Sequence, residues 1–281
     1  MKVSEYAHHL LSHGTLSDKL LCTSKVTEFD HDFTVKLFDY PAREAKLSFS
    51  EKQIKFPKKN SFVNERERGK ALHFFANHEL LAIEMMAQAL LMFPKLGKTS
   101  QKLLLKTISE EQDHLNLYLG RMKELNITFG DFPLNNFFWS YMKKIKSPEE
   151  FFSVMSLTFE QANLDFCLFY KELFEKFNDE KSAKILDTIY LDEIKHVARG
   201  KREVQERIFS KDNEDDEQKE DALWRYYLSA LPYPLTPARA KGIGFDREGR
   251  KKTGLSDEFI NKLEYYCDEF NITKRKAWSR R

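Results

Sequence analysis

The fold of this chain is decided by residues 184–200, which read KILDTIYLDEIKHVARG. Within this stretch Glu193 and His196 lie three residues apart, and on a helix that turns about 100° per residue two such side chains share one face. A carboxylate and an imidazole in this arrangement can reach a common point, which is a spacing typical of metal ligands. A single Glu-x-x-His in a charged helix is usually an accident of composition, so the pair gains its meaning from the rest of the chain.

The chain contains a second copy of this motif, because Glu111 and His114 repeat the spacing. An apolar helical segment with one inward carboxylate precedes each copy. Glu79 precedes the first copy by 32 residues, and Glu160 precedes the second by 33. The spacing therefore predicts two helical hairpins of nearly equal length.

Two such hairpins offer four carboxylates and two imidazoles, the ligand set of di-iron and di-manganese carboxylate bundles. The candidate metal ligands are Glu79, Glu111, His114, Glu160, Glu193 and His196. Four carboxylates that face one another repel and are desolvated, which favours two divalent ions over a single Zn²⁺. In such a centre Glu111 and Glu193 can bridge, Glu79 and Glu160 can be terminal, and each histidine can take one metal.

Two short segments resemble bacterioferritins. Residues 77–83, NHELLAI, are similar to the helix that carries their first terminal ligand, and residues 192–196, DEIKH, are similar to their Asp-Glu-x-Lys-His motif. The chain resembles still more closely an uncharacterised bacterial family of ferritin-like proteins, a family of unknown function. The matching segments are residues 78–80, 110–111, 130–133, 158–164, 192–197 and 234–242.

This resemblance implies an all-α fold of the ferritin-like dimetal-carboxylate superfamily. The expected architecture is a four-helix bundle with a left crossover between the two hairpins, an N-terminal wrap and a basic C-terminal extension. The resemblance implies a metal site but no established substrate.

Helix start and stop signals predict four bundle helices and, from them, four parts of the chain. The predicted bundle helices are residues 63–93, 99–125, 148–177 and 181–209. Pro94 ends the first, and Ser147 with Pro148 begins the third as cap and first-turn proline. The expected domains are an N-terminal helical and irregular extension over 1–62, the bundle over 63–210, an acidic linker over 211–221 and a C-terminal extension over 222–281.

Composition favours long helices and limits the expected partners. The chain has 281 residues, 41% of them hydrophobic, with only ten glycines and eight prolines. The net charge of +2 does not by itself indicate a nucleic-acid partner. Residues 232–281 carry 12 Lys and Arg against 7 Asp and Glu, so RNA stays a minor option.

The sequence predicts a cytoplasmic protein. No stretch reaches the roughly 18 apolar residues that cross a bilayer, and the first residues lack the apolar core of a signal peptide. The three cysteines are unclustered and odd in number, which fits a reducing compartment.

Residues beside the ligands are candidates for supporting roles. Asp192 and Asp113 can receive the second N–H of a ligating imidazole, although surface acids are the common alternative. Tyr118 and Tyr190 share the metal-facing stripe, where aromatic residues are more often core than catalytic. Beyond the metal centre, no catalytic residue is predicted.

One alternative for a ligand stays open. Glu84 lies five residues after Glu79, about 140° away around the helix, so either can face the site but not easily both. The bacterioferritin-like match favours Glu79.

The leading functional hypothesis is a di-iron, or mixed manganese and iron, oxidoreductase that uses O₂ to hydroxylate or oxidise an unidentified substrate. Its partners would be a small molecule or a modified macromolecule, and an electron donor. The alternatives are a ferritin-like ferroxidase that handles iron, a tRNA-modifying hydroxylase, and a bundle in which a structural metal supports an interaction surface.

Overall fold

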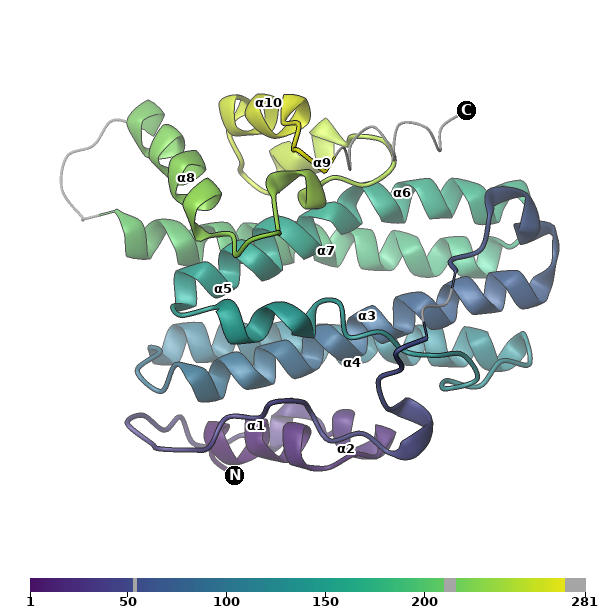
Figure 1. Ribbon diagram of the computed structural model, residues 1–281, viewed down its shortest axis with the longest axis horizontal. Coiled ribbons are helices and arrows are strands. Elements are labelled where there is room, and N and C mark those ends of the chain that lie inside the picture. The colour runs from purple at the N-terminus through teal and green to yellow at the C-terminus, as the bar shows by residue number, and fades with distance from the viewer. Residues whose placement is uncertain (53–54, 210–215, 271–281) are drawn as a thin grey trace. The chain divides into compact units, whose positions relative to one another are not determined.

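The computed structural model describes residues 1–52, 55–209 and 216–270, and for 216–221 the backbone only. The regular structure of these residues is helical, with no β-strand among them (Figure 1). This confirms the predicted all-α class. The chain divides into two compact units, one of Met1–Lys143 with Lys176–Ile185 and one of Lys144–Glu175 with Leu186–Arg281. Each unit holds most of one predicted hairpin.

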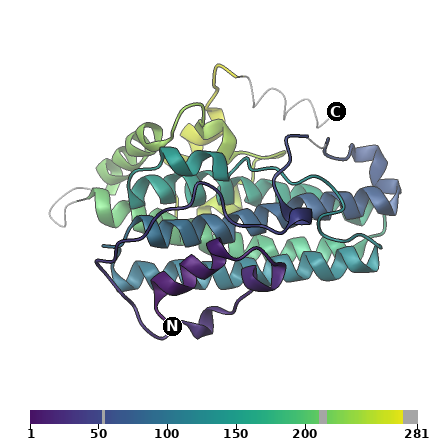
Figure 2. The same ribbon diagram turned by 60° about the horizontal axis from the view of Figure 1, so that its bottom comes forward.

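The first unit is built on the hairpin of α3 (Glu65–Met92) and α4 (Lys98–Glu124). The Asn64 side chain caps α3 by accepting a hydrogen bond from the Arg66 N–H, and the helix ends two residues before Pro94. α1 (Val3–Ser12) packs on α3, and α2 (Leu16–Lys19) follows it, as the purple segment of Figures 1 and 2 shows. Short 3₁₀ turns are η1 (Thr23–Lys25), η2 (Ala45–Leu47), η3 (Lys59–Val63) and η4 (Trp139–Lys144).

The second unit contains most of the other hairpin. Its helices are α5 (Pro148–Val154), η5 (Met155–Glu160), α6 (Gln161–Lys176) and α7 (Glu180–Ile208). Ser147 caps α5 by accepting from the Glu150 N–H, with Pro148 in the first turn, as predicted. One continuous helix was predicted over 148–177, but η5 is a π-helix that separates α5 from α6.

The C-terminal part of the second unit is more helical than its sequence pattern predicts. It contains α8 (Asp216–Ala230), η6 (Pro237–Ala240), α9 (Arg247–Lys252) and α10 (Asp257–Tyr265). α8 begins inside the segment 211–221 that was predicted as a linker, and α9 and α10 were not predicted. Residues 271–281 of the predicted basic extension lie outside the described part of the chain.

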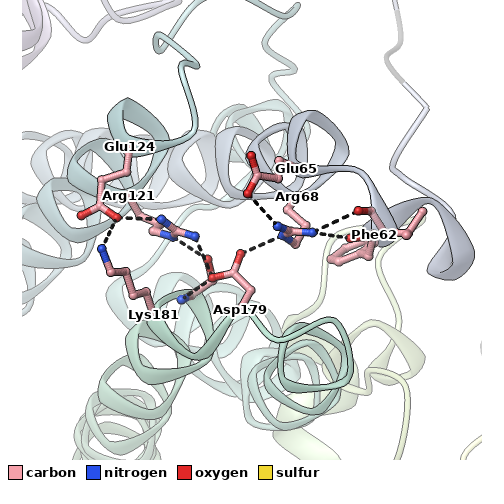
Figure 3. Close-up of polar contacts among 9 residues, drawn as sticks. Phe62, Glu65, Arg68, Arg121, Glu124, Asp179 and Lys181 are labelled. Carbon is pink, nitrogen blue, oxygen red and sulfur yellow. Dashed lines mark hydrogen bonds and ion pairs between the residues drawn. The ribbon is translucent and has the colours of Figure 1, made fainter.

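A buried carboxylate joins three helices of the first unit (Figure 3). Asp179 accepts hydrogen bonds from Arg68 Nε at 2.9 Å and from Arg121 Nη2 at 2.8 Å. It also accepts from the Ser182 N–H at 3.1 Å, which caps the start of α7. Burial alone would raise the pKa of Asp179, but the Ser182 hydrogen bond and the Arg121 charge outweigh it and hold the pKa below its usual value. The Asp179 carboxylate therefore connects α3, α4 and the first turn of α7.

The loop after α4 is tied to α3 by a neutral histidine. Gly130 has a φ of 101°, and a Cβ there would lie 2.7 Å from the Lys46 carbonyl oxygen, so this turn requires glycine. Its N–H donates to His73 Nε2 at 2.9 Å. Burial lowers the pKa of His73 to about 4, against the opposing charge of Asp131.

His73 should make folding stability depend on pH between 6.5 and about 4. The pKa of His73 is lower in the folded protein than in the unfolded one. The contribution of His73 to the free energy of unfolding, up to about 3 kcal/mol, is therefore complete above the unfolded pKa and is lost as the pH falls through the folded pKa. We expect His73→Gln, whose amide oxygen can accept the same bond, to flatten that part of the curve. Urea unfolding at pH steps from 7 to 4 measures it, and equal slopes in both proteins would contradict the assignment.

Candidate metal centre

Three predicted ligands of the first unit lie together in its interior. Glu79 projects from α3, and Glu111 and His114 from α4, with exposed fractions of 4%, 1% and 1%. One ligand atom from each lies within 4.8 Å of the others. His114 Nδ1 is 3.2 Å from Glu111 Oε2, as expected for residues one helical turn apart.

The chemistry of this donor set fits a metal ion. An ion bound at about 2.1 Å by each ligand keeps the ligand atoms about 3 to 4 Å apart, so small side-chain movements would close these three on one ion. Two buried carboxylates beside an imidazole are costly without a compensating cation. Carboxylate and imidazole ligands suit iron, manganese or zinc.

The other carboxylate considered on α3 has different partners. Glu84 is fully buried, and its Oε2 accepts from Arg43 Nη2 at 2.6 Å while its Oε1 lies 3.1 Å from Lys19 Nζ. Both cations come from the N-terminal segment that packs on α3. Glu79 is thus the α3 glutamate that lies beside Glu111 and His114.

The second unit carries the remaining three predicted ligands. Glu160 ends the π-helix η5, and Glu193 and His196 lie on α7, all at most 3% exposed. His196 Nδ1 lies 3.5 Å from Glu193 Oε2. In both Glu-x-x-His motifs the histidine Nδ1 faces the carboxylate one turn earlier, at 3.2 Å in the first motif and 3.5 Å in the second.

Asn163 is a residue of this region that the sequence pattern did not single out. Its Nδ2 donates to Glu193 Oε1 at 2.7 Å, which fixes one oxygen of that carboxylate. Partners of this kind orient metal ligands and raise metal affinity. Asn163 could have been identified from the sequence by its position one helical turn after Glu160.

The two aspartates that were candidates for supporting roles lie at or near the surface. Asp113 is exposed. Asp192 accepts a hydrogen bond from Lys195 Nζ at 2.7 Å, with 21% of its side chain exposed. The contact between Asp192 and Lys195 is an ordinary ion pair near the surface.

The two tyrosines are both in packed surroundings. Tyr118 is 2% exposed, and its ring lies 5.9 Å from that of Phe75. Tyr190 donates its hydroxyl to Asp246 Oδ2 at 2.8 Å, and burial, followed by that aspartate, raises its pKa. Tyr190 thus holds the segment that leads into α9.

The structure thus defines the class of this protein. Its described residues form an all-helical fold, and buried glutamate and histidine groups within it can hold a metal ion. The chain belongs to the family described as "Protein of unknown function (DUF455)", which matches residues 3–261. No curated protein and no solved structure matches the chain. None of the helices in the described ranges is both long and apolar enough to cross a membrane.

Proposed function

We propose that this chain is a dimetal-carboxylate oxidoreductase with a ferritin-like bundle and left crossover, using O₂ to hydroxylate or oxidise a substrate. The observation that supports it most is the buried meeting of Glu79, Glu111 and His114 in the α3–α4 hairpin. The second Glu-x-x-His motif on α7, where His196 Nδ1 also faces its glutamate, adds to it.

In this proposal both hairpins serve one centre. Glu79, Glu111 and His114 from one hairpin and Glu160, Glu193 and His196 from the other would hold two metal ions. Four carboxylates balance the charge of two divalent ions, so the filled centre would be close to neutral in its buried surroundings.

Two bound iron ions, or one manganese and one iron, would supply the redox chemistry of O₂ activation. The residues of the chain hold the ligands in place and keep water away. Asn163 fixes one oxygen of Glu193. One residue before Glu79 in α3, the His78 ring lies 4.6 Å from the ring of Phe74 and 4.6 Å from that of Phe138.

The proposed partners are an electron donor and an organic substrate, either a small molecule or a macromolecule, in the cytoplasm. A closed cage of many subunits, measured by size-exclusion chromatography with light scattering, would favour iron storage instead. A monomer or dimer would favour the oxidoreductase.

The metal content of the purified protein tests the proposal. We expect about two Fe or Mn per wild-type chain. Glu111→Gln should lose at least half of this metal, because it replaces a charged carboxylate ligand by a neutral amide. Glu110→Gln, one residue earlier on α4 and half-buried, is the matched control and should retain wild-type content.

Two results of this elemental analysis would contradict the proposal. One is a single Zn per chain. The other is a metal content that is the same in wild type, Glu111→Gln and Glu110→Gln. If two metals are found, O₂ uptake by the reduced protein then separates an oxidoreductase from a structural metal centre.

A further inference from the structure

The π-helix before Glu160 is held by two hydroxyl groups. Thr158 Oγ1 donates to the Ser153 carbonyl at 2.8 Å, and Tyr227 of α8 donates to the Leu157 carbonyl at 3.0 Å. The two hydroxyl oxygens lie 2.8 Å apart. A π-helix is rare and contains one residue more than an α-helix would in the same turn, so donors to carbonyls at this turn add to what holds η5 in the π form.

The geometry of the three contacts gives Tyr227 a definite role. Each hydroxyl has one proton, so two protons serve three short contacts. With Thr158 donating to Ser153, the Tyr227 proton goes to the Leu157 carbonyl and is shared with Thr158 Oγ1. Burial raises the pKa of Tyr227, so it stays a neutral donor at physiological pH.

Tyr227 is itself firmly held. It is fully buried, and its ring lies 5.9 Å from Trp224 and 5.7 Å from Phe259 of α10. α8 and α10 thus hold a rigid hydroxyl against η5. Removing only the hydroxyl should leave this aromatic packing in place.

The form of η5 affects the ligands of the second unit. Glu160 is the last residue of η5, and loss of the extra residue per turn would rotate the side chains beyond it by about 100°. η5 also lies close to α7, since a Cβ on Gly200 would be 2.0 Å from the Cβ of Ser156. A change of η5 would therefore disturb both Glu160 and the helix that carries Glu193 and His196.

We infer that Tyr227 is a positioning residue for the metal centre, because its hydroxyl keeps η5 in the π-helical form that aims Glu160. This inference rests on the proposed function. It assigns to α8, outside the four helices of the predicted bundle, a part in metal binding.

The test compares Co²⁺ binding by wild type, Tyr227→Phe and Tyr226→Phe, all prepared free of metal. Titration calorimetry gives the affinity, and the visible absorption of Co²⁺ reports its coordination. We expect Tyr227→Phe to weaken binding about 10-fold or more, as loss of an outer partner does, and to change the absorption spectrum. Tyr226→Phe, the neighbouring half-buried tyrosine, should behave as wild type.

A second variant tests the same contact independently, in case Tyr227→Phe does not fold. Thr158→Val keeps the size of the side chain and removes the other hydroxyl, and we expect the same direction of change. Lower melting temperatures of the metal-free variants with wild-type affinity and spectrum would overturn the inference and leave the proposed function standing. A wild-type chain that binds no Co²⁺ would overturn both.

Discussion

Replacing Glu84 by glutamine is expected to lower the free energy of unfolding by about 3–5 kcal/mol, the usual cost of removing one partner of a buried ion pair. Its carboxylate contacts Arg43 at 2.6 Å and Lys19 at 3.1 Å, and all three side chains are at most 2% exposed. The variant leaves two buried cations without their counter-charge. Burial lowers the pKa of Lys19, and the charge and hydrogen bond of Glu84 oppose this effect, so Glu84 favours the charged ammonium.

Glu79→Gln on the same helix is the matched control. In the metal-free protein it should change the free energy of unfolding little, because it relieves repulsion with Glu111. Urea unfolding in the presence of a chelator measures both variants. Equal stability of Glu84→Gln and wild type, or a larger loss in Glu79→Gln, would show that the two glutamates have been assigned the wrong roles.

Replacing Asp165 by asparagine is expected to cost a similar amount, about 3–5 kcal/mol, in the second unit. Asp165 accepts two hydrogen bonds from Arg250, at 2.6 and 2.9 Å, and the Arg250 side chain is fully buried. It also accepts from the backbone N–H groups of Gly242 and Asp246, both at 2.7 Å. Asparagine keeps the size of the side chain but cannot neutralise the guanidinium.

The matched control for this variant is Asp187→Asn. Asp187 pairs with Lys171 at 2.7 Å, but its side chain is 49% exposed, so its loss should cost less than about 1 kcal/mol. Urea unfolding compares the two. Limited proteolysis adds a local measure, since we expect faster cleavage between residues 240 and 250 in Asp165→Asn alone. Similar stability losses in the two variants would contradict a buried role for Asp165.

The sequence was a good guide where the physical cause is local. The end of α3 before Pro94 and the start of α5 at Ser147 follow from proline geometry and side-chain capping. The shared face of Glu111 and His114 follows from three-residue spacing on a helix, and the structure has their ligand atoms in contact distance.

Other features depend on hydrogen bonds that no periodic pattern records. η5 has the apolar composition of an ordinary helix, and its π form rests on Thr158 and on Tyr227, about 70 residues later. α9 is short and charged, so its helical signal is weak. α10 has a capping Ser256 and buried Phe259, Ile260 and Leu263, a signal that the prediction missed. The position of α9 is set by Arg250 and Asp246, which contact Asp165 and Tyr190.

The sequence by itself determined the all-helical class, and it indicated two hairpins and six candidate ligands, because helix periodicity and residue chemistry are properties of neighbouring positions. Only the tertiary structure shows that Glu79 and Glu84 have different partners. Both are buried on one helix, and the difference is that Lys19 and Arg43, brought by the N-terminal segment, neutralise Glu84. Glu79 instead lies with Glu111 and His114, which is a matter of packing between helices and not of spacing along one.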